Sequence, residues 1–198
     1  WGALLVPLRG DASHPVAVTS GGVLEPMDVL GALVRAAGMG YGPERTVLYG
    51  VSMGGSAALK AAALAGDAVP GILVVHGGFN RFFAAAGKKL GGLGTRLLRW
   101  AMPGGAVRDL DSFEAATYAG LCPDRVRLVY ISAEMDTTCD SSHGEEIMSR
   151  RSGSEVWVLP GERHPDRSNA CSPGLLAAFE GIRAMQNERP AAGNGGDL

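Results

Sequence analysis

The chain has 198 residues, of which 46% are hydrophobic and 19% are charged, and its formal net charge is −2. That balance is typical of one globular domain with a substantial core. It lacks the basic excess that nucleic-acid binding usually leaves, and no apolar run approaches the roughly 20 residues needed to cross a bilayer. We therefore expect neither a nucleic-acid partner nor a transmembrane segment.

Short apolar runs alternate with helix-like segments along the chain. In chain order, we expect a strand at residues 3–8, a helix at 25–37, a strand at 45–51, a helix at 53–64, strands at 71–75 and 126–132, a helix at 142–150, a strand at 155–159 and a helix at 173–185. Continuous apolar strands are typical of a parallel sheet that is covered on both faces. The pattern predicts an α/β fold, with a mostly parallel sheet and helices on both faces.

The alternation suggests one domain over residues 1–186, followed by a disordered tail at 187–198 that is rich in Gly, Pro, Ala and Asn. About fifty residues, 77–125, interrupt the alternation of single strands and single helices between two expected strands. They fit an ordinary crossover helix with a short second helix, or a small cap over a substrate pocket at about 79–122. Basic and apolar residues alternate at helical spacing in 81–102, so contact with a membrane surface is a third alternative.

The cysteines are sparse and show no metal-type spacing. Cys122, Cys139 and Cys171 fit free thiols in a reducing compartment, which favours the cytoplasm, and a Cys139–Cys171 bridge is the alternative. The chain begins at Trp1, with no initiator methionine and no signal-like segment, so we expect the natural N-terminus to lie upstream.

The segment Gly50-Val-Ser-Met-Gly54 carries the strongest chemical signal. It has the G-x-S-x-G pattern between an expected strand and an expected helix, which is the context of a nucleophile elbow. We expect side chains at Gly50 and Gly54 to collide with the flanking strand and helix. Ser52 is therefore the candidate nucleophile, and the backbone N–H of Met53 is a candidate donor to an oxyanion.

A serine nucleophile needs a base, and the chain offers four histidines. His164 follows an apolar strand that ends in Pro-Gly, and a parallel sheet brings such a loop to the edge where Ser52 lies. His164 is therefore the preferred base. His76 is the alternative, although we expect it to bind a backbone group. His14 lies in a polar loop, and His143 is expected to be solvated.

A carboxylate must orient the base, and Asp136 occupies a loop directly after an expected strand. Glu134 and Asp140 lie in the same region and are competitors. Asp136 is favoured because it completes the chain order Ser52, Asp136, His164, which is the order found in α/β-hydrolases.

Up to about Met185, these motifs resemble the α/β-hydrolase superfamily, in particular serine esterases, monoglyceride lipases and serine aminopeptidases. The similar segments are Leu5-Val-Pro-Leu-Arg-Gly10 (D-x-R-G-x-G), Leu48-Tyr-Gly-Val-Ser-Met-Gly-Gly55 (G-x-S-M-G-G), Ser132-Ala-Glu-Met-Asp-Thr-Thr138 (G-x-x-D-x-x-V-P) and Leu159-Pro-Gly-Glu-Arg-His164 (x-x-G-x-x-H). The chain departs from the pattern where Pro7 or Leu8 replaces an Asp, Ala133 replaces a Gly and Asp140 replaces a Pro.

The resemblance implies that the strand at residues 3–8 is the fourth of eight in this fold. The third strand would lie between it and the Ser52 strand, and the loop after that third strand supplies a second oxyanion donor. Neither is found in the sequence, so we expect a piece of a longer hydrolase or a shortened homologue, with unpaired sheet edges.

The expected activity is hydrolysis of an ester, thioester or amide of a small or lipid-like acyl group, through an acyl-enzyme on Ser52. Asp136 and His164 complete the triad, and no cofactor or metal is expected. The alternatives are a non-catalytic binding module on the same fold, and an enzyme that transfers the acyl group to an alcohol.

Overall fold

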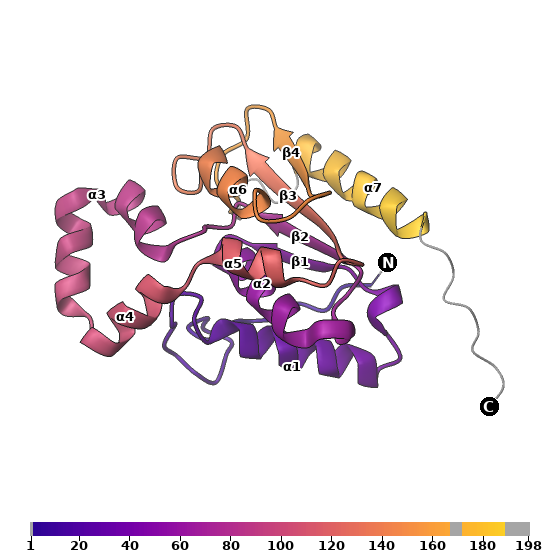
Figure 1. Cartoon of the computed structure of the whole chain (residues 1–198), viewed down its shortest axis with the longest axis horizontal. Helices are drawn as coiled ribbons and strands as arrows, with labels where there is room; N and C mark the ends of the chain where they lie inside the picture. Colours follow the sequence, from indigo (N-terminus) through magenta and orange to yellow (C-terminus); the bar gives the residue numbers. More distant parts are fainter. Residues whose placement is uncertain (1, 167–171, 189–198) are drawn as a thin grey trace.

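The computed structural model describes residues 2–166 and 172–188. Its helices and strands alternate in the way that the sequence predicts (Figure 1). In chain order they are α1 (Glu25–Gly38), β1 (Leu48–Val51), α2 (Met53–Ala65), β2 (Ile72–His76), α3 (Phe82–Ala101), α4 (Gly104–Ser112), α5 (Ala115–Leu121), β3 (Arg127–Ala133), α6 (Ser141–Met148), β4 (Glu155–Leu159) and α7 (Pro173–Asn187).

The strands form a parallel sheet in the order β1-β2-β3-β4. One row of the sheet runs across Gly50, Val75, Tyr130 and Val156, so the carboxyl ends of the strands lie at one edge. All residues of β2 are buried, as expected of a continuous apolar strand covered on both faces. The predicted α/β fold with a parallel sheet is confirmed.

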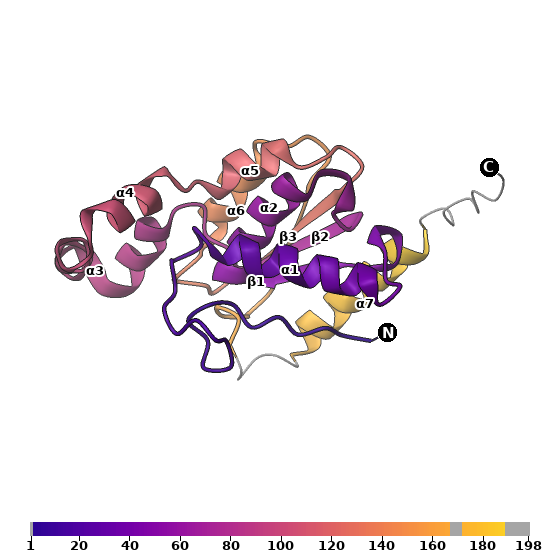
Figure 2. The same cartoon turned by 90° about the horizontal axis from the view of Figure 1, so that it is seen from below.

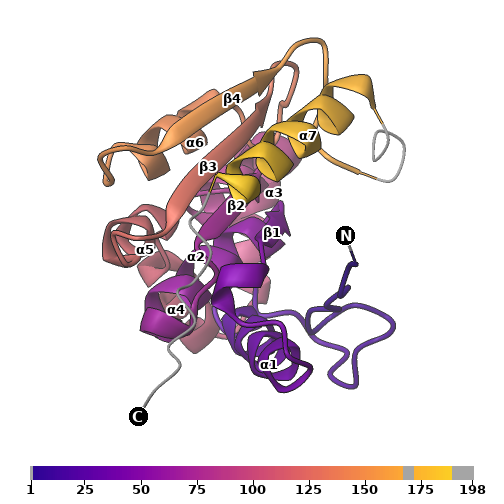
Figure 3. The ribbon, with the colours of Figure 1, turned by 90° about the vertical axis from the view of Figure 1, so that its right-hand side faces the viewer.

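Helices cover both faces of the sheet: α2, α5 and α6 lie on one face, and α7 lies on the other (Figure 3). Successive residues of a strand point to opposite faces, so β2 and β3 contribute side chains to two cores. The core under α2, α5 and α6 includes Leu59, Leu73, Val75, Leu128, Tyr130 and Ile147. The core under α7 includes Ile72, Val74, Val129, Ile131, Leu175 and Ile182.

The prediction of a strand at residues 3–8 is wrong. Among the described residues the sheet consists of β1 to β4, and residues 3–8 lie outside it, without a strand partner for their backbone groups. The segment runs along α1 instead, with Leu8 packed against α1 and α2 and Leu5 88% exposed (Figure 2). The Arg9 N–H donates to Asp28 Oδ2 on α1 at 2.9 Å, which fixes the end of the segment.

Residues 77–125 form three helices rather than one crossover helix with a short second one. The helix α3 bends at Gly91, where φ is +69°, and its second half projects with α4 away from the body of the molecule (Figures 1 and 2). The guanidinium of Arg99 on α3 binds both carboxylate oxygens of Asp111 on α4, at 2.7 and 2.6 Å. We call residues 82–112, which comprise α3 and α4, the arm.

Two further expectations concern the C-terminal part of the chain. The helix α7 continues through Asn187, the first residue of the expected disordered tail, and residues 189–198 lie outside the described residues. Cys122 and Cys139 are buried free thiols. Cys171, the expected partner of Cys139 in the alternative bridge, lies outside the described residues.

Candidate active site

Ser52 occupies the sharp turn between β1 and α2. Its backbone has φ +52° and ψ −122°, and it is the one residue other than glycine with a positive φ in the described part of the chain. This conformation is costly for an L-residue and recurs at functional sites. The Ser52 N–H donates to the His76 carbonyl at 2.8 Å, so the pairing of β1 with β2 extends into the turn and holds it.

Glycines on either side of Ser52 make the turn possible. A Cβ at Gly50 would lie 2.4 Å from the Gly54 carbonyl oxygen, and a Cβ at Gly55 would lie 2.9 Å from a Val75 methyl group. At Gly54 the nearest atom, in Leu8, would be 3.7 Å away, which is an ordinary contact. The expected collision of a side chain is therefore confirmed at Gly50 and wrong at Gly54. Gly55, which was not predicted, is a second position at which a side chain would collide.

The structure brings Ser52, His164 and Asp136 together in one line of hydrogen bonds. His164 Nε2 lies 3.0 Å from Ser52 Oγ, and His164 Nδ1 lies 2.7 Å from Asp136 Oδ2. The three residues come from the turn after β1, the loop after β3 and the loop after β4. Because these strands are parallel, all three loops leave the same edge of the sheet.

Asp136 is buried, and its second oxygen is also occupied. Oδ1 accepts hydrogen bonds from the backbone N–H groups of Thr138 and Cys139, each at 2.8 Å. Burial alone raises the pKa of this carboxyl, but the hydrogen bonds from His164 and from the two amides outweigh it and hold the pKa below its ordinary value. Asp136 is therefore a carboxylate at neutral pH.

The two competitors for the role of the acid are engaged elsewhere. Glu134 Oε2 accepts the Gly161 N–H at 2.8 Å, which ties the loop after β3 to the loop after β4. Asp140 pairs with Lys88 at the root of the arm and accepts a hydrogen bond from Ser142 Oγ at 2.5 Å.

The other histidines have different partners. His76 Nδ1 lies 2.6 Å from the Tyr49 hydroxyl, so its side chain binds a tyrosine rather than the backbone group that we expected. Burial, with the nearby His164 as a second cause, lowers the pKa of His76 to about 4, so its ring is neutral at neutral pH. The Tyr49 hydroxyl is the donor that suits this neutral ring.

The expectation that His143 is solvated is wrong. The side chain is buried under α6, its Nδ1 accepts the Asn80 N–H at 3.2 Å, and burial lowers its pKa. His14 lies in the N-terminal loop as expected, where its Nδ1 accepts the Val16 N–H at 3.0 Å. Its Nε2 lies 3.5 Å from Asp28 Oδ1 on α1. The partner of His14 is therefore Asp28 and not Ser52.

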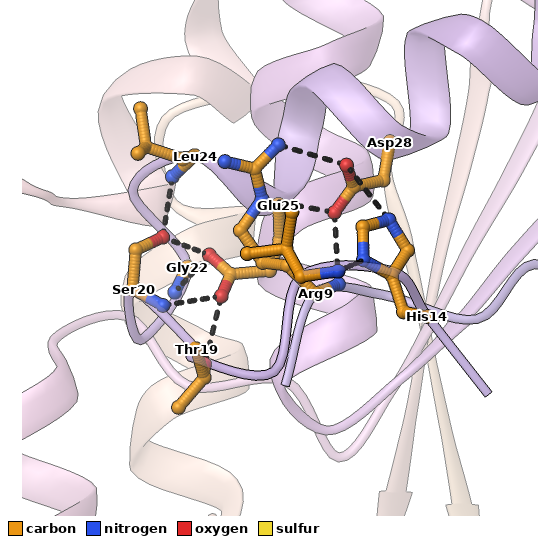
Figure 4. A network of polar contacts seen from close by, with 9 residues as sticks. Arg9, His14, Thr19, Ser20, Gly22, Leu24, Glu25 and Asp28 are labelled. Atoms are coloured by element: carbon orange, nitrogen blue, oxygen red, sulfur yellow. Dashed lines mark hydrogen bonds and ion pairs between the residues drawn. The ribbon is translucent and has the colours of Figure 1, made fainter. Parts of the chain in front are cut away.

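A buried carboxylate beside the Ser52 turn was not singled out from the sequence. Glu25, at the start of α1, is fully buried and accepts hydrogen bonds from the Thr19 hydroxyl, the Ser20 N–H and hydroxyl, and the Gly22 N–H (Figure 4). Burial raises the pKa of Glu25, but the hydrogen bonds from Ser20 and Thr19 outweigh it, so the pKa is lowered. The sequence signal that could have identified Glu25 is a Thr-Ser-Gly-Gly run that lies shortly before an acidic first helical turn.

The loop that Glu25 holds connects the Ser52 turn to the arm. The Thr19 hydroxyl contacts Met53 Sδ at 3.5 Å. On the other side, a Cβ at Gly21 would lie 2.7 Å from Leu110 Cδ2 on α4, so the loop lies directly against the arm. A disturbance of Glu25 would therefore reach both the residue after Ser52 and the root of the arm.

Two pockets flank the His164 loop. One, of about 440 Å³, is lined by Met135, Thr137, Arg163, His164 and Asp166. The other, of about 200 Å³, is mainly apolar and lies toward α7; it is lined by Tyr49, Val51, His76, Pro165, Asp166, Leu175 and Phe179. Within residues 2–166 and 172–188, no group of His, Cys, Asp and Glu has the arrangement of a metal site, and no helix is long and apolar enough to span a membrane.

No protein-family model matches the chain, and no curated protein matches its sequence. Among solved structures, a puromycin hydrolase aligns with a TM-score of 0.60 and 19% identity over 87% of this chain, which spans only 27% of that protein. An esterase of Pyrococcus furiosus aligns with a TM-score of 0.62 and 16% identity, covering 90% of this chain and 68% of the esterase.

The α/β hydrolase GrgF of Penicillium sp. sh18 aligns with a TM-score of 0.64 and 12% identity, covering 90% of this chain and 78% of its own. At these identities the likeness concerns the fold. It agrees with the parallel sheet and the helices on both faces. The chain has the α/β-hydrolase fold.

Proposed function

We propose that this protein is a serine hydrolase that cleaves an ester, thioester or amide through an acyl-enzyme on Ser52. The observation that carries the proposal is the line of two hydrogen bonds from Asp136 through His164 to Ser52. A nucleophile in contact with a base, and a base held by a third group, is the arrangement that activates a serine hydroxyl.

In the first step, Ser52 Oγ attacks the substrate carbonyl carbon while its proton passes to His164 Nε2. The separation of 3.0 Å is within the range for direct proton transfer. The protonated imidazole then donates this proton to the leaving group. Water attacks the acyl-enzyme in the second half of the reaction, with His164 again as the base, and Ser52 is regenerated.

Asp136 orients the base. Its Oδ2 accepts the His164 Nδ1–H, which leaves Nε2 unprotonated and aimed at Ser52. The carboxylate also stabilises the imidazolium that forms in each half-reaction. The two backbone amides on Oδ1 hold Asp136 ionised and fixed.

The Met53 N–H supports the negative charge that develops on the substrate oxygen. Met53 is the first residue of α2, where an N–H group has no carbonyl one turn earlier to bind and where the helix dipole is positive. Donors aimed at a developing oxyanion are among the largest contributions to acyl-transfer catalysis. The proposed steps require only protein groups and water.

The proposed substrate carries a small or lipid-like acyl group. The pocket of about 440 Å³ borders the proposed base His164, and Ser52 is not among its lining residues. Solved structures of similar fold include a puromycin hydrolase and an esterase, which supports an amide or an ester as the cleaved bond. Rates on p-nitrophenyl esters of increasing acyl length, with Ser52→Ala as the control, test the proposal. Turnover that survives Ser52→Ala would refute it.

A non-catalytic binding module is the second candidate. The observation that favours it is the outer edge of β1, which is unpaired within the described residues and lies beside the Ser52 turn, where the proposed oxyanion donor is the Met53 N–H. Loss of one such donor costs about 10²–10³ in rate. A folded protein that binds acyl compounds but turns over none of them would support this candidate against the first.

A further inference from the structure

The arm leaves the edge of the sheet that carries the candidate active site. The chain enters it directly after the carboxyl end of β2, and α3 and α4 extend from there beyond the sheet (Figure 1). At the root of the arm, Lys88 pairs with Asp140, four residues after Asp136 in the same loop. The root of the arm therefore lies against the loop that carries Asp136.

The second half of α3 presents an apolar stripe to solvent. The stripe consists of Leu93, Leu97 and Trp100, which are 73%, 58% and 85% exposed. Their spacing of four and three residues places them on one face of the helix. Arg99 lies away from this face, since its guanidinium stacks 4.3 Å from the Phe83 ring centroid and binds Asp111. The stripe is therefore not the face by which α3 packs on the rest of the arm.

The arm is basic although the chain as a whole is acidic. It contains five Lys and Arg residues and two Asp residues, a net charge of +3, whereas the full chain has −2. Lys89, Arg96 and Arg108 are exposed, and within the described ranges no carboxylate forms a salt bridge with them. Arg96 lies beside the stripe, one residue before Leu97.

We propose that the arm docks on an anionic lipid surface, with the apolar stripe at the level of the headgroups. Trp and Leu lie on one helix face, with Arg96 beside them, in an arm of net positive charge. This combination matches both the apolar and the charged layers of such a surface. A second copy of the chain fits less well, because two arms of like charge would repel each other. Docking would turn the catalytic edge toward the membrane, and this consequence rests on the proposed hydrolase function.

Vesicle flotation with the full chain tests the docking. The probes are vesicles of phosphatidylcholine and phosphatidylserine in equal proportion, and vesicles of phosphatidylcholine alone. We expect binding to the mixed vesicles, weaker binding to the neutral ones, and weakening by salt. The double variant Leu97→Ser, Trp100→Ser should bind about tenfold or more weakly, because two large side chains no longer leave water.

Three further variants make the result specific. Leu5→Ser removes a side chain that is 88% exposed outside the arm and should leave binding unchanged. Arg96→Gln should weaken binding to the mixed vesicles only. Ser52→Ala should bind vesicles as the unchanged chain does, which separates docking from catalysis. Trp100→Phe should abolish a blue shift of tryptophan fluorescence on binding.

The proposal is overturned if the folded chain floats with neither vesicle, or if Leu5→Ser and the stripe variant bind equally. It is also overturned if the stripe variant changes only the oligomeric state in sedimentation, because the stripe would then be a contact between copies. Circular dichroism of each variant establishes that its fold is intact.

Discussion

His164 Nδ1 and Asp136 Oδ2 lie 2.7 Å apart, although the two residues are separated by 28 positions in the chain. The contact is supported from both sides. Two backbone amides bind the other oxygen of Asp136, and the Met135 N–H donates to the Glu162 carbonyl at 2.7 Å, which joins the two loops. Asp136 thus fixes the ring of His164 more firmly than a surface ion pair would.

The first prediction concerns this contact. In Asp136→Asn, the amide keeps the shape of the carboxylate but no longer requires a proton on His164 Nδ1, so the ring adopts the wrong tautomer. We expect kcat to fall by about 10⁴ with little change in fold. The control is Glu134→Gln in the same loop, which should change kcat by less than about tenfold because Glu134 Oε2 accepts the Gly161 N–H. Equal losses in both variants would contradict the assigned role of Asp136.

The second prediction compares two glycines of the Ser52 turn. Gly50→Ala places a methyl group 2.4 Å from the Gly54 carbonyl oxygen, so the turn must open. We expect this variant to lose about 3 kcal/mol of unfolding free energy, and with it the reactivity of Ser52. Gly54→Ala has room and lies in a helix, so its stability should be equal or slightly higher. Chemical denaturation of the two variants checks the order.

The third prediction concerns Glu25. Glu25→Ala leaves the donors of the Thr19–Gly22 loop without their buried acceptor, and we expect a loss of about 3 kcal/mol in unfolding free energy. Glu180→Ala is the matched control, because that side chain is exposed; it should change stability by less than about 0.5 kcal/mol. A Glu25→Ala protein as stable as this control would show that the network in Figure 4 contributes nothing.

The fourth prediction concerns the stability of the folded protein at low pH. The pKa of His76 is about 4 in the folded protein, and the ordinary value is 6.5. Between these values the unfolded chain binds a proton that the folded protein does not, so unfolding free energy falls as the pH falls from about 6.5 to about 4. The loss reaches about 3 kcal/mol.

In His76→Asn this part of the acid sensitivity should disappear, because no group at that position titrates in the window. The measurement is the midpoint of urea unfolding at a series of pH values for both proteins. Parallel curves for the two proteins would contradict the lowered pKa.

The sequence predicted the sheet and the meeting of three loops well, because both follow from local patterns. Ser52, Asp136 and His164 each follow a strand that is a continuous apolar run. Parallel strands bring the loops that follow them to one edge of the sheet. The strained backbone at Ser52 was also predicted, from Gly50 and Gly54, although of these two only Gly50 lacks room for a side chain.

Features that depend on distant neighbours were not predicted. Residues 3–8 have the composition of a strand, but a strand also requires a partner edge, which only the fold reveals. His143 has polar neighbours in sequence, yet α6 turns it into the core against Asn80. The bend at Gly91 and the exposure of Trp100 likewise follow from tertiary packing, so the arm could not be distinguished from an ordinary crossover.

Labelling with a fluorophosphonate probe, followed by mass spectrometry of the digested chain, tests the central claim most directly. We predict that the probe modifies Ser52, that His164→Gln slows the labelling by at least about 10³-fold, and that Ser52→Ala abolishes it. A folded chain that remains unlabelled, or that is labelled equally well when Ser52 is replaced by Ala, would contradict the account.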